Sequence, residues 1–248
     1  MNIEICAYSL ESSLNAQKSG ATRVELCGGL GEGGTTPSAG MIQAVREAIH
    51  IALYVMIRPR GGDFVYEPQE FNTMKRDIDF ARKLGADGVV LGVLLPDGRV
   101  DIERTRALVE YAHPMGVTFH RAFDLTPDPL EALEAIIQTG AERILTSGQQ
   151  SGAPAGAPLL SKLVKEAKNR IEIMAGGGVS VDNAEALAAT GVDALHLTGK
   201  SFRPGRQTYF PSHISMAGEI PDERSLLYSD PSRIEPLVQL FASREVKK

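Results

Sequence analysis

The stretch Gly20-Ala-Thr-Arg-Val-Glu-Leu-Cys27 indicates how the chain folds, because three later segments repeat its design. These segments are Gly85-Ala-Asp-Gly-Val-Val-Leu-Gly92, Gly140-Ala-Glu-Arg-Ile-Leu-Thr-Ser147 and Gly191-Val-Asp-Ala-Leu-His-Leu-Thr198. Each begins with a glycine that follows a helix-like stretch, and glycine is the usual residue at a left-handed helix stop. A short apolar run follows, which is typical of a buried strand. We therefore interpret each segment as a joint between a helix and the next strand.

Four further strand-like runs lie between these joints, at residues 3–8, 52–58, 117–122 and 171–176. Eight strands that alternate with helices predict a parallel sheet with right-handed crossovers, and eight such units in about 250 residues are typical of a barrel. The alternative, a doubly wound open sheet, requires a glycine fingerprint after the first strand, where this chain has Tyr8-Ser-Leu-Glu-Ser12. We predict an α/β protein with a single (β/α)8 TIM barrel over residues 1–201. Residues 202–248 are expected to form an irregular segment and a terminal helix, residues 233–246, packed on the barrel.

Composition and charge restrict the classes of function. The 248 residues carry 26 lysines and arginines against 31 aspartates and glutamates, a net charge of −5, which favours neither nucleic acid nor an anionic membrane as a partner. The longest apolar stretch, residues 48–57, is too short to span a bilayer. Two cysteines cannot form a disulfide framework, and their number is typical of a reducing compartment. We expect a cytoplasmic protein.

Alternation along the strands predicts which side chains face the interior of the barrel. Val24, Leu26, Ile144 and Leu195 are apolar and are expected to face the helices. The opposite set is expected inside and is rich in polar groups: Glu4, Cys6, Arg23, Glu25, Cys27, Met56, Arg58, Thr118, His120, Arg143 and His196. Barrel interiors are normally aliphatic, and buried charges are costly unless they are paired. The charged set therefore predicts either a structural ion network of Glu4, Arg23, Glu25 and Arg143 or a functional site.

The loops at the carboxyl ends of the strands carry the groups from which barrel sites are built. Gly176-Gly177-Gly178-Val-Ser180 and Thr198-Gly-Lys200-Ser201 resemble the phosphate cradles of other barrels, although the glycines could simply allow tight turns. With the loops after strands three and five, they predict a set of substrate- or anion-binding residues: Arg58, Arg60, Arg121, Asp124, Gly176, Gly177, Gly178, Lys200 and Ser201. Glu25 and His120 are the candidates for general acid or base in an enzyme acting on a small phosphorylated or carboxylated substrate.

Several longer motifs are specific enough to be compared with known families. They are Glu4-Ile-Cys6, Arg23-Val-Glu-Leu-Cys27, Glu32-Gly-Gly-Thr-Thr-Pro-Ser38, Met56-Ile-Arg-Pro-Arg-Gly-Gly-Asp-Phe64, Thr118-Phe-His-Arg-Ala-Phe-Asp124 and Leu145-Thr-Ser-Gly148. Together they resemble the CutC family, whose members are often labelled copper homeostasis proteins, and the resemblance extends from residue 2 to about 201. It implies a TIM barrel, a cytoplasmic location, self-association as a dimer or tetramer, and a role in copper handling. It implies no known reaction.

The resemblance also implies a metal site. The family's proposed Cu(I) ligands are the cysteines that end strands one and two, which correspond to Cys6 and Cys27 here. Cu(I) is a soft ion that suits two thiolates, and neighbouring strands about 4.8 Å apart can bring two cysteines together. Two alternatives stay open: the cysteines are ordinary buried residues, or the barrel is an enzyme of unknown reaction. The sequence predicts no organic cofactor, and without a CxxC motif or a Cys/His cluster it predicts no structural zinc site.

Overall fold

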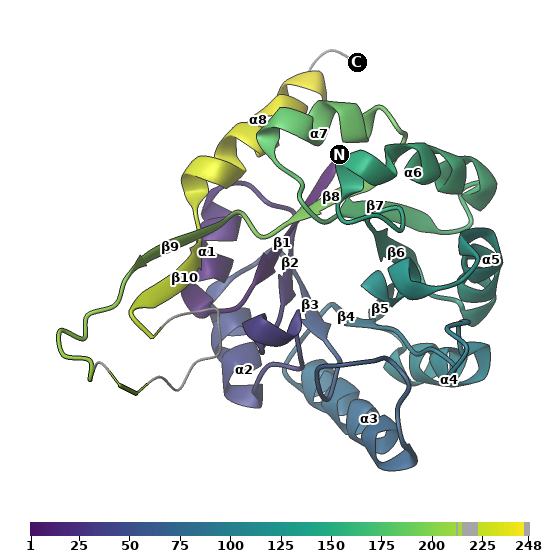
Figure 1. Ribbon diagram of the computed structural model, residues 1–248, viewed down its shortest axis with the longest axis horizontal. Coiled ribbons are helices and arrows are strands. Elements are labelled where there is room, and N and C mark those ends of the chain that lie inside the picture. The colour runs from purple at the N-terminus through teal and green to yellow at the C-terminus, as the bar shows by residue number, and fades with distance from the viewer. Residues whose placement is uncertain (212, 215–222, 246–248) are drawn as a thin grey trace.

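The computed structural model describes residues 1–211, 213–214 and 223–245, and its strands and helices alternate around a closed barrel (Figure 1). The barrel strands are β1 (Asn2–Ala7), β2 (Arg23–Leu26), β3 (Ala52–Met56), β4 (Gly88–Leu91), β5 (Gly116–Phe119), β6 (Arg143–Thr146), β7 (Glu172–Gly176) and β8 (Ala194–Leu197). The helices outside them are α1 (Leu10–Lys18), α2 (Ala39–Ala48), α3 (Pro68–Lys83), α4 (Ile102–Ala112), α5 (Pro129–Thr139), α6 (Ala153–Ala167), α7 (Val181–Ala188) and α8 (Pro231–Glu245). Two short 3-10 helices, η1 (Leu30–Glu32) and η2 (Arg121–Leu125), follow β2 and β5.

Neighbouring strands pair in parallel in the order of the chain, and β1 pairs with β8 to close the barrel. This confirms the predicted (β/α)8 TIM barrel. The four glycines of the repeat, Gly20, Gly85, Gly140 and Gly191, have φ angles of 85°, 82°, 82° and 92°. A side chain would be strained in this left-handed region, which glycine enters without steric cost. Each glycine therefore turns the chain from a helix into the following strand.

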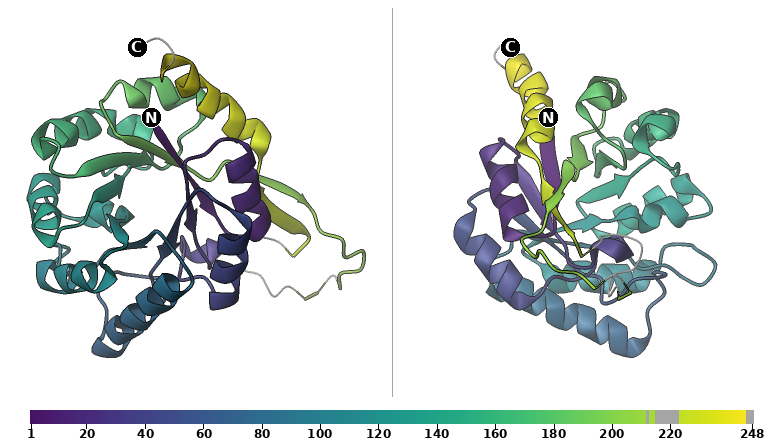
Figure 2. Two further views of the ribbon diagram at one scale, coloured as in Figure 1. Left: turned by 180° about the vertical axis from the view of Figure 1, so that it is seen from behind. Right: turned by 60° about the vertical axis from the view of Figure 1, so that its left-hand side comes forward.

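The C-terminal segment is more ordered than the sequence predicts. Strand β9 (Lys200–Pro204) pairs antiparallel with β10 (Ser225–Ser229), and the two form an arm that extends outward beside α1 (Figure 1, Figure 2). Helix α8 then contacts both α7 and α1, so it completes the ring of outer helices. The last helix of the barrel thus lies beyond residue 201. The expected helix over residues 233–246 corresponds to α8, and its residue 246 lies outside the described residues.

Side chains alternate between two apolar layers, as the sequence predicts. The large core between strands and helices includes Val24, Leu26, Ile144 and Leu195. A smaller cluster inside the barrel is formed by Cys6, Cys27, Tyr54, Met56 and Val90. Among the described residues, no helix is long and apolar enough to cross a membrane.

The ring of Tyr54 fills the deep part of the barrel interior. The guanidinium carbons of Arg23 and Arg143 lie 4.9 and 5.5 Å from its centroid, a distance typical of cation–π contacts. Gly88, its neighbour on β4, leaves the room for the ring, because a Cβ at that position would lie 2.2 Å from Cε1 of Tyr54. The ring of Tyr54, which fits because Gly88 on the adjacent strand has no side chain, therefore closes this end of the barrel.

Glu4 lies at the centre of the charged groups inside the barrel and has no exposed surface. Nε of Arg23 donates to one of its oxygens, and Nδ1 of His196 lies 2.7 Å from the other. Burial raises the pKa of Glu4, but the hydrogen bond and charge of His196 and the charge of Arg23 outweigh this effect and lower the pKa to about 2. Glu4 is therefore ionised at neutral pH.

The predicted ion network is thus divided into separate pairs. Arg143 does not share Glu4 with Arg23 but lies 2.9 Å from Glu142 and 2.7 Å from Glu172. Among the described residues, Glu25 faces His196 rather than an arginine. The expectation of a structural network therefore fits both arginines, whereas Glu25 belongs to a different group.

Replacing Gly88 with alanine should destabilise the barrel, because the new methyl group would overlap the ring of Tyr54 and overpacking typically costs about 1–3 kcal/mol. Gly40 in α2 is the matched control, since a Cβ there meets no atom within 4 Å. Gly40→Ala should stabilise the protein by up to about 1 kcal/mol, because alanine is the better helix former. Urea unfolding measures both changes. Equal stabilities of the two variants would show that Tyr54 does not fill this position.

Replacing Glu4 with glutamine should lower the free energy of unfolding at neutral pH by about 3–5 kcal/mol, the usual cost of removing one partner of a buried ion pair. The pKa of Glu4 is about 2 in the folded protein, below its ordinary value of 4.5. Its contribution is therefore complete above pH 4.5 and is lost as the pH falls towards 2. The difference between wild type and variant in urea unfolding should shrink over this range. A difference that is independent of pH would contradict the assignment.

Candidate functional site

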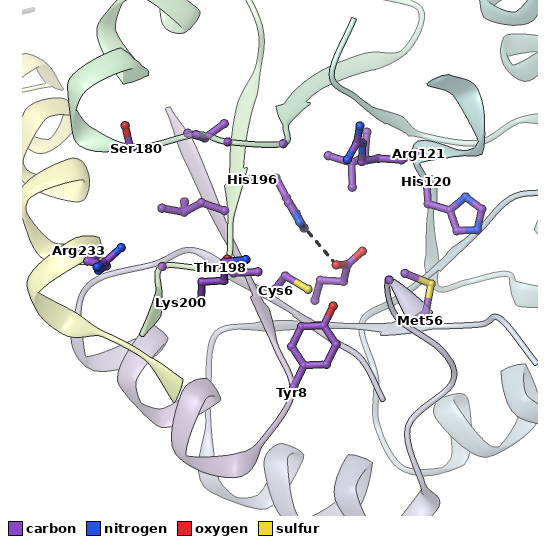
Figure 3. Close-up of a pocket in the computed structure, with 18 of the residues that line it drawn as sticks. Cys6, Tyr8, Met56, His120, Arg121, Ser180, His196, Thr198, Lys200 and Arg233 are labelled. Carbon is purple, nitrogen blue, oxygen red and sulfur yellow. Dashed lines mark ion pairs between the residues drawn. The ribbon is translucent and has the colours of Figure 1, made fainter. Parts of the chain in front are cut away.

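The loops at the carboxyl ends of the strands surround a pocket of about 630 Å³ (Figure 3). Pockets of roughly 300–1,000 Å³ typically bind small molecules. Many of its lining residues were predicted from the sequence: Cys6, Glu25, Met56, Arg58, His120, Arg121, Gly177, Gly178, His196 and Lys200. The pocket therefore gathers side chains from strands that are far apart in the sequence.

The two cysteines lie side by side, with Cys6 in the wall of the pocket and Cys27 behind it. Their Sγ atoms are 3.8 Å apart, and both thiols are free and buried. The Sγ atom of Cys27 also lies 3.6 Å from Oε2 of Glu25. The backbone N–H of Cys27 donates to the carbonyl of Ala7 at 2.9 Å, which fixes this residue against β1. The structure thus brings the two predicted ligands together.

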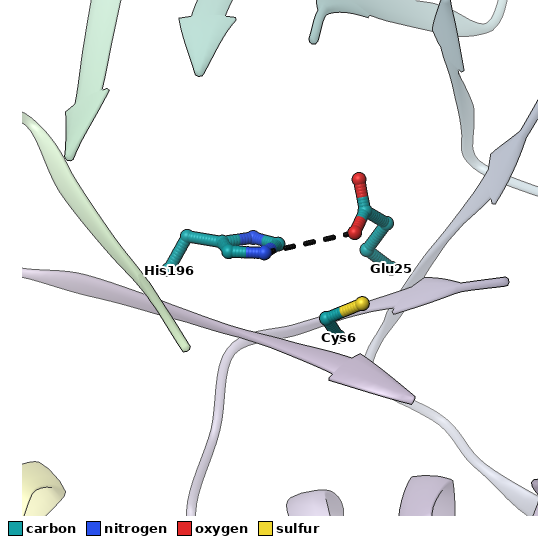
Figure 4. Close-up of side chains that lie close together, drawn as sticks. All are labelled: Cys6, Glu25 and His196. Carbon is teal, nitrogen blue, oxygen red and sulfur yellow. Dashed lines mark ion pairs between the residues drawn. The ribbon is translucent and has the colours of Figure 1, made fainter. Parts of the chain in front are cut away.

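His196 on β8 and Glu25 on β2 face each other beside Cys6 (Figure 4). Nε2 of His196 is 3.7 Å from Oε2 of Glu25, and the ligand atoms of Cys6, Glu25 and His196 all lie within 4.8 Å of one another. The strand register explains this arrangement, because β1 places Glu4 opposite His196 on β8 and Cys6 opposite Glu25 on β2. A thiol, an imidazole and a carboxyl group therefore meet at one point.

The pKa values of the groups at this point are shifted in different directions. The hydrogen bond from Cys27 lowers the pKa of Cys6, and His196 adds to this effect against the opposing influence of burial. The same hydrogen bond, together with burial, raises the pKa of Cys27. Burial and the negative charge of Cys6 raise the pKa of Glu25. Burial lowers the pKa of His196, yet its contacts with Glu25, Cys6 and Glu4 raise it well above the ordinary value. The contacts around Cys6 and His196 therefore favour the thiolate and the imidazolium, whereas those around Cys27 and Glu25 favour the protonated thiol and carboxyl group.

His120 lies in the wall of the same pocket, directly after β5. Its ring packs against Phe64, with the ring centroids 4.8 Å apart. Burial and the charge of Arg58 lower the pKa of His120 to about 3, so the imidazole is neutral at neutral pH. The two residues predicted for acid–base chemistry, Glu25 and His120, thus line one pocket.

Two of the arginines predicted to bind anions, Arg58 and Arg60, make hydrogen bonds and an ion pair within the loops. Arg58 lines the pocket, but its guanidinium donates to the carbonyls of Glu32 at 2.5 Å and Gly62 at 2.8 Å. Arg60 lies 2.5 Å from Glu70 and is absent from the pocket lining that the described residues form. Their N–H groups satisfy carbonyl and carboxylate groups of the loops, which leaves few for a ligand.

Arg121 enters the pocket from η2 and is held in place by Asp124. Its Nε donates to Asp124 at 2.7 Å, and its Nη2 donates to the hydroxyl of Ser147 at 2.9 Å. Asp124 also accepts from the hydroxyl of Thr146 at 2.5 Å and the backbone N–H of Gln149 at 3.1 Å. The carboxylate of Asp124 therefore contacts Arg121 and groups at the end of β6, and it is absent from the pocket lining that the described residues form.

Only some of the residues predicted to form an anion site after β7 and β8 line the pocket. Gly177, Gly178 and Lys200 line the pocket. Gly176, the last residue of β7, and Ser201, in β9, do not belong to the lining that the described residues form. The amino end of α7 and the first residue of β9 therefore supply this side of the pocket.

Sequence analysis did not identify Tyr8 and Arg233, which also line the pocket. Tyr8 follows Glu4 and Cys6 at alternate positions, so the alternation along the strand could have predicted that its side chain faces the interior. Arg233 comes from α8, and no local pattern links that helix to the pocket. Figure 3 shows Arg233 and Lys200 on the same side of the pocket.

The comparisons with known proteins agree with this architecture. The CutC family model matches residues 1–201. A human protein named copper homeostasis protein cutC homolog is 44% identical over 237 residues, which cover 95% of this chain and 87% of that protein. A CutC family protein of Chromobacterium violaceum is 46% identical over 236 residues, covering 95% and 96%.

Solved structures extend the comparison to three dimensions. A CutC protein from Streptococcus agalactiae has a TM-score of 0.76 at 37% identity, covering 80% of this chain and 98% of that chain. A thiamine phosphate pyrophosphorylase from Pyrococcus furiosus has a TM-score of 0.61 at 17% identity, covering 98% and 96%, and shares the fold alone. The family match and the identities show that this chain belongs to the CutC family.

Proposed function

We propose that this protein serves copper homeostasis in the cytosol by holding Cu(I) between Cys6 and Cys27. The observation that carries the proposal is the distance of 3.8 Å between two buried sulfur atoms. One ion bridging two thiolates in a line, with bonds of ~2.3 Å, would separate the sulfurs by about 4.6 Å. The pair therefore holds an ion in a bent arrangement or opens by about 0.8 Å, a change that small rotations of the side chains provide.

The charges around the two sulfurs favour a soft cation. The lowered pKa of Cys6 favours its thiolate, whereas the raised pKa of Cys27 means that this thiol has to release its proton when the ion binds. Thiolates are the ligands that Cu(I) prefers, and a reducing compartment such as the cytosol keeps both of them available. The human and mouse relatives carry the name copper homeostasis protein cutC homolog, which supports a link with this metal.

A second candidate function is favoured by the size of the pocket. A volume of about 630 Å³ is far larger than a single ion needs and suits an organic molecule. Glu25, whose raised pKa favours the protonated form, would act as a general acid, while Lys200, Arg121 and Arg233 supply positive charge for an anionic group. We propose this enzyme of small phosphorylated or carboxylated substrates as the alternative to copper binding.

Under reducing, anaerobic conditions the protein should bind about one Cu(I) per chain in competition with a Cu(I) chelator. Cys6→Ser and Cys27→Ser should each abolish tight binding, because a hydroxyl is a harder and poorer ligand than a thiolate. The apo proteins should unfold at nearly the wild-type urea concentration, since a barrel of this size does not depend on a metal for its fold.

Met56→Leu is the matched control for the cysteine variants, because Met56 packs in the same interior cluster and leucine keeps its volume. It should retain tight copper binding. If the double serine variant holds copper as tightly as wild type, the thiols are ordinary core residues and the copper proposal is wrong.

The enzyme alternative predicts that inorganic phosphate stabilises the fold through Lys200. At ten times its dissociation constant a ligand stabilises by about 1.4 kcal/mol, which raises the melting temperature of a chain of this length by roughly 3–6 °C. Lys200→Ala should remove most of this gain, whereas Lys165→Ala, the same charge change on α6 outside the pocket, should keep it. Equal gains in all three proteins would leave only the general effect of an excluded salt.

A further inference from the structure

We propose that Cys6, Glu25 and His196 form a binding site for a divalent metal ion of the zinc type, with one coordination position open to the pocket. The inference goes beyond both proposed functions, because it combines a single thiol with a nitrogen and an oxygen ligand. Three features of the structure support it: the set of donor atoms, the orientation of the histidine, and the position of the three side chains in the pocket wall. The ligands come from β1, β2 and β8, so no local spacing in the sequence marks the site.

The donor atoms match the ligands of zinc in kind and in spacing. One ligand atom from each of Cys6, Glu25 and His196 lies within 4.8 Å of the other two, and Nε2 of His196 is 3.7 Å from Oε2 of Glu25 (Figure 4). Donor atoms bound at ~2.0–2.3 Å to one tetrahedral ion are about 3.3–3.6 Å apart. The nitrogen and the oxygen thus face each other beyond hydrogen-bond distance, and a small movement of the side chains would close them around an ion.

The charge and the softness of this set also fit zinc. A thiolate and a carboxylate together balance two positive charges, and a neutral imidazole adds a lone pair. Cu(I) is softer and suits two thiolates, whereas a mixed set of sulfur, nitrogen and oxygen ligands suits Zn²⁺. Cys6 can therefore serve either metal: with Cys27 it would hold Cu(I), and with Glu25 and His196 it would hold Zn²⁺. One ion would exclude the other.

A carboxylate behind the histidine holds the ring in the orientation that a metal ligand needs. Nδ1 of His196 lies 2.7 Å from Oε1 of Glu4, whose other oxygen accepts from Nε of Arg23. A carboxylate paired with a guanidinium is an acceptor, so Nδ1 carries the hydrogen and donates it, which leaves Nε2 facing Glu25. Histidines that bind metal ions almost always donate their other ring N–H to a carboxylate, a backbone carbonyl or water in this way.

The three side chains are accessible from the pocket, because all of them line it. The side chain of His196 is 11% exposed, and Figure 3 shows its ring directed into the middle of the pocket. Three protein ligands with one open position are typical of catalytic zinc sites, whereas structural sites are closed by four. The open position would take a water molecule or an oxygen atom of a molecule in the pocket of about 630 Å³.

The experiment titrates the full chain with Zn²⁺, and separately with Co²⁺ as a spectroscopic substitute, under anaerobic conditions with a phosphine reductant. Calorimetry should show one tightly bound Zn²⁺ per chain. Co²⁺ should give a thiolate charge-transfer band in the near ultraviolet and the intense visible bands of a four-coordinate ion. Glu25→Gln, which keeps the size of the side chain, and Cys6→Ser should each weaken Zn²⁺ binding more than about a hundredfold, because changes to outer-shell partners alone cost 10–100-fold.

Matched variants separate this site from the pair of thiols. Cys27→Ser should lose Cu(I) but bind Zn²⁺ within about tenfold of wild type, because it removes no ligand of this site. Glu25→Gln should show the reverse, losing Zn²⁺ and keeping Cu(I). Glu47→Gln and His50→Gln, both on the surface, should change neither metal. Circular dichroism checks that each variant folds, and the Co²⁺ spectrum of wild type tests the site without any variant.

Several outcomes would overturn the inference. Zn²⁺ binding that is absent in wild type, or equal in wild type and Glu25→Gln, would contradict it and leave the copper proposal intact, because Cu(I) needs only the two thiols. If Cys27→Ser loses Zn²⁺ as completely as Cys6→Ser while Glu25→Gln retains it, the ion lies on the pair of thiols instead. A Co²⁺ spectrum of a six-coordinate ion without the charge-transfer band would exclude the thiolate ligand.

Discussion

The carboxylate of Glu4 is fully buried, so it requires positively charged partners inside the barrel. These partners lie on the two neighbouring strands, β2 and β8. Arg23 on β2 and His196 on β8 each bind one of its oxygens. These contacts join the first strand to the second and to the last, at the seam where the barrel closes. They also orient the imidazole of His196, whose other nitrogen faces Glu25. The geometry of the site therefore depends on a residue that a ligand in the pocket does not contact.

The charge of Glu4 influences the pKa values of the neighbouring His196 and Glu25. Contacts with Glu25, Cys6 and Glu4 raise the pKa of His196, and the hydrogen bond and charge of His196 in turn help to lower the pKa of Cys6. The pKa values of Cys27 and Glu25 are raised because burial and the neighbouring Cys6 disfavour a further negative charge there. These shifts are consistent with the two functions that we propose, a cation at the sulfurs or proton donation by Glu25. A metal ion and an organic ligand would compete for the same charges.

The parts of the structure that depend on local pattern could be predicted from the sequence. A glycine such as Gly20 ends a helix, and alternation along β2 places Arg23, Glu25 and Cys27 inside. The parts that depend on how loops meet could not. Arg58 and Arg60 look like anion-binding residues, but loop carbonyls and Glu70 occupy their donors. Besides Arg121, the partners of Asp124 lie on β6 and its loop, more than twenty residues away along the chain. The strands β9 and β10 are short and separated by a long segment, so their pairing leaves no periodic signal.

The position of the arm has a consequence for how this protein can vary. The chain leaves β8 at Leu197 and begins α8 at Pro231, so the arm lies within the last loop of the barrel, with β10 packed beside α1. The entropy lost on closing a loop grows slowly with its length, by about 0.6 kcal/mol for each doubling. The segment that joins β9 to β10 can therefore be lengthened at little cost to stability, while the hydrogen bonds of Ser229 with Ser12 and Asn15 hold the base of the arm and α8 still carries Arg233 into the pocket wall. The strands that hold the thiols have no such freedom, because a shift of one residue would turn Cys6 towards the helices.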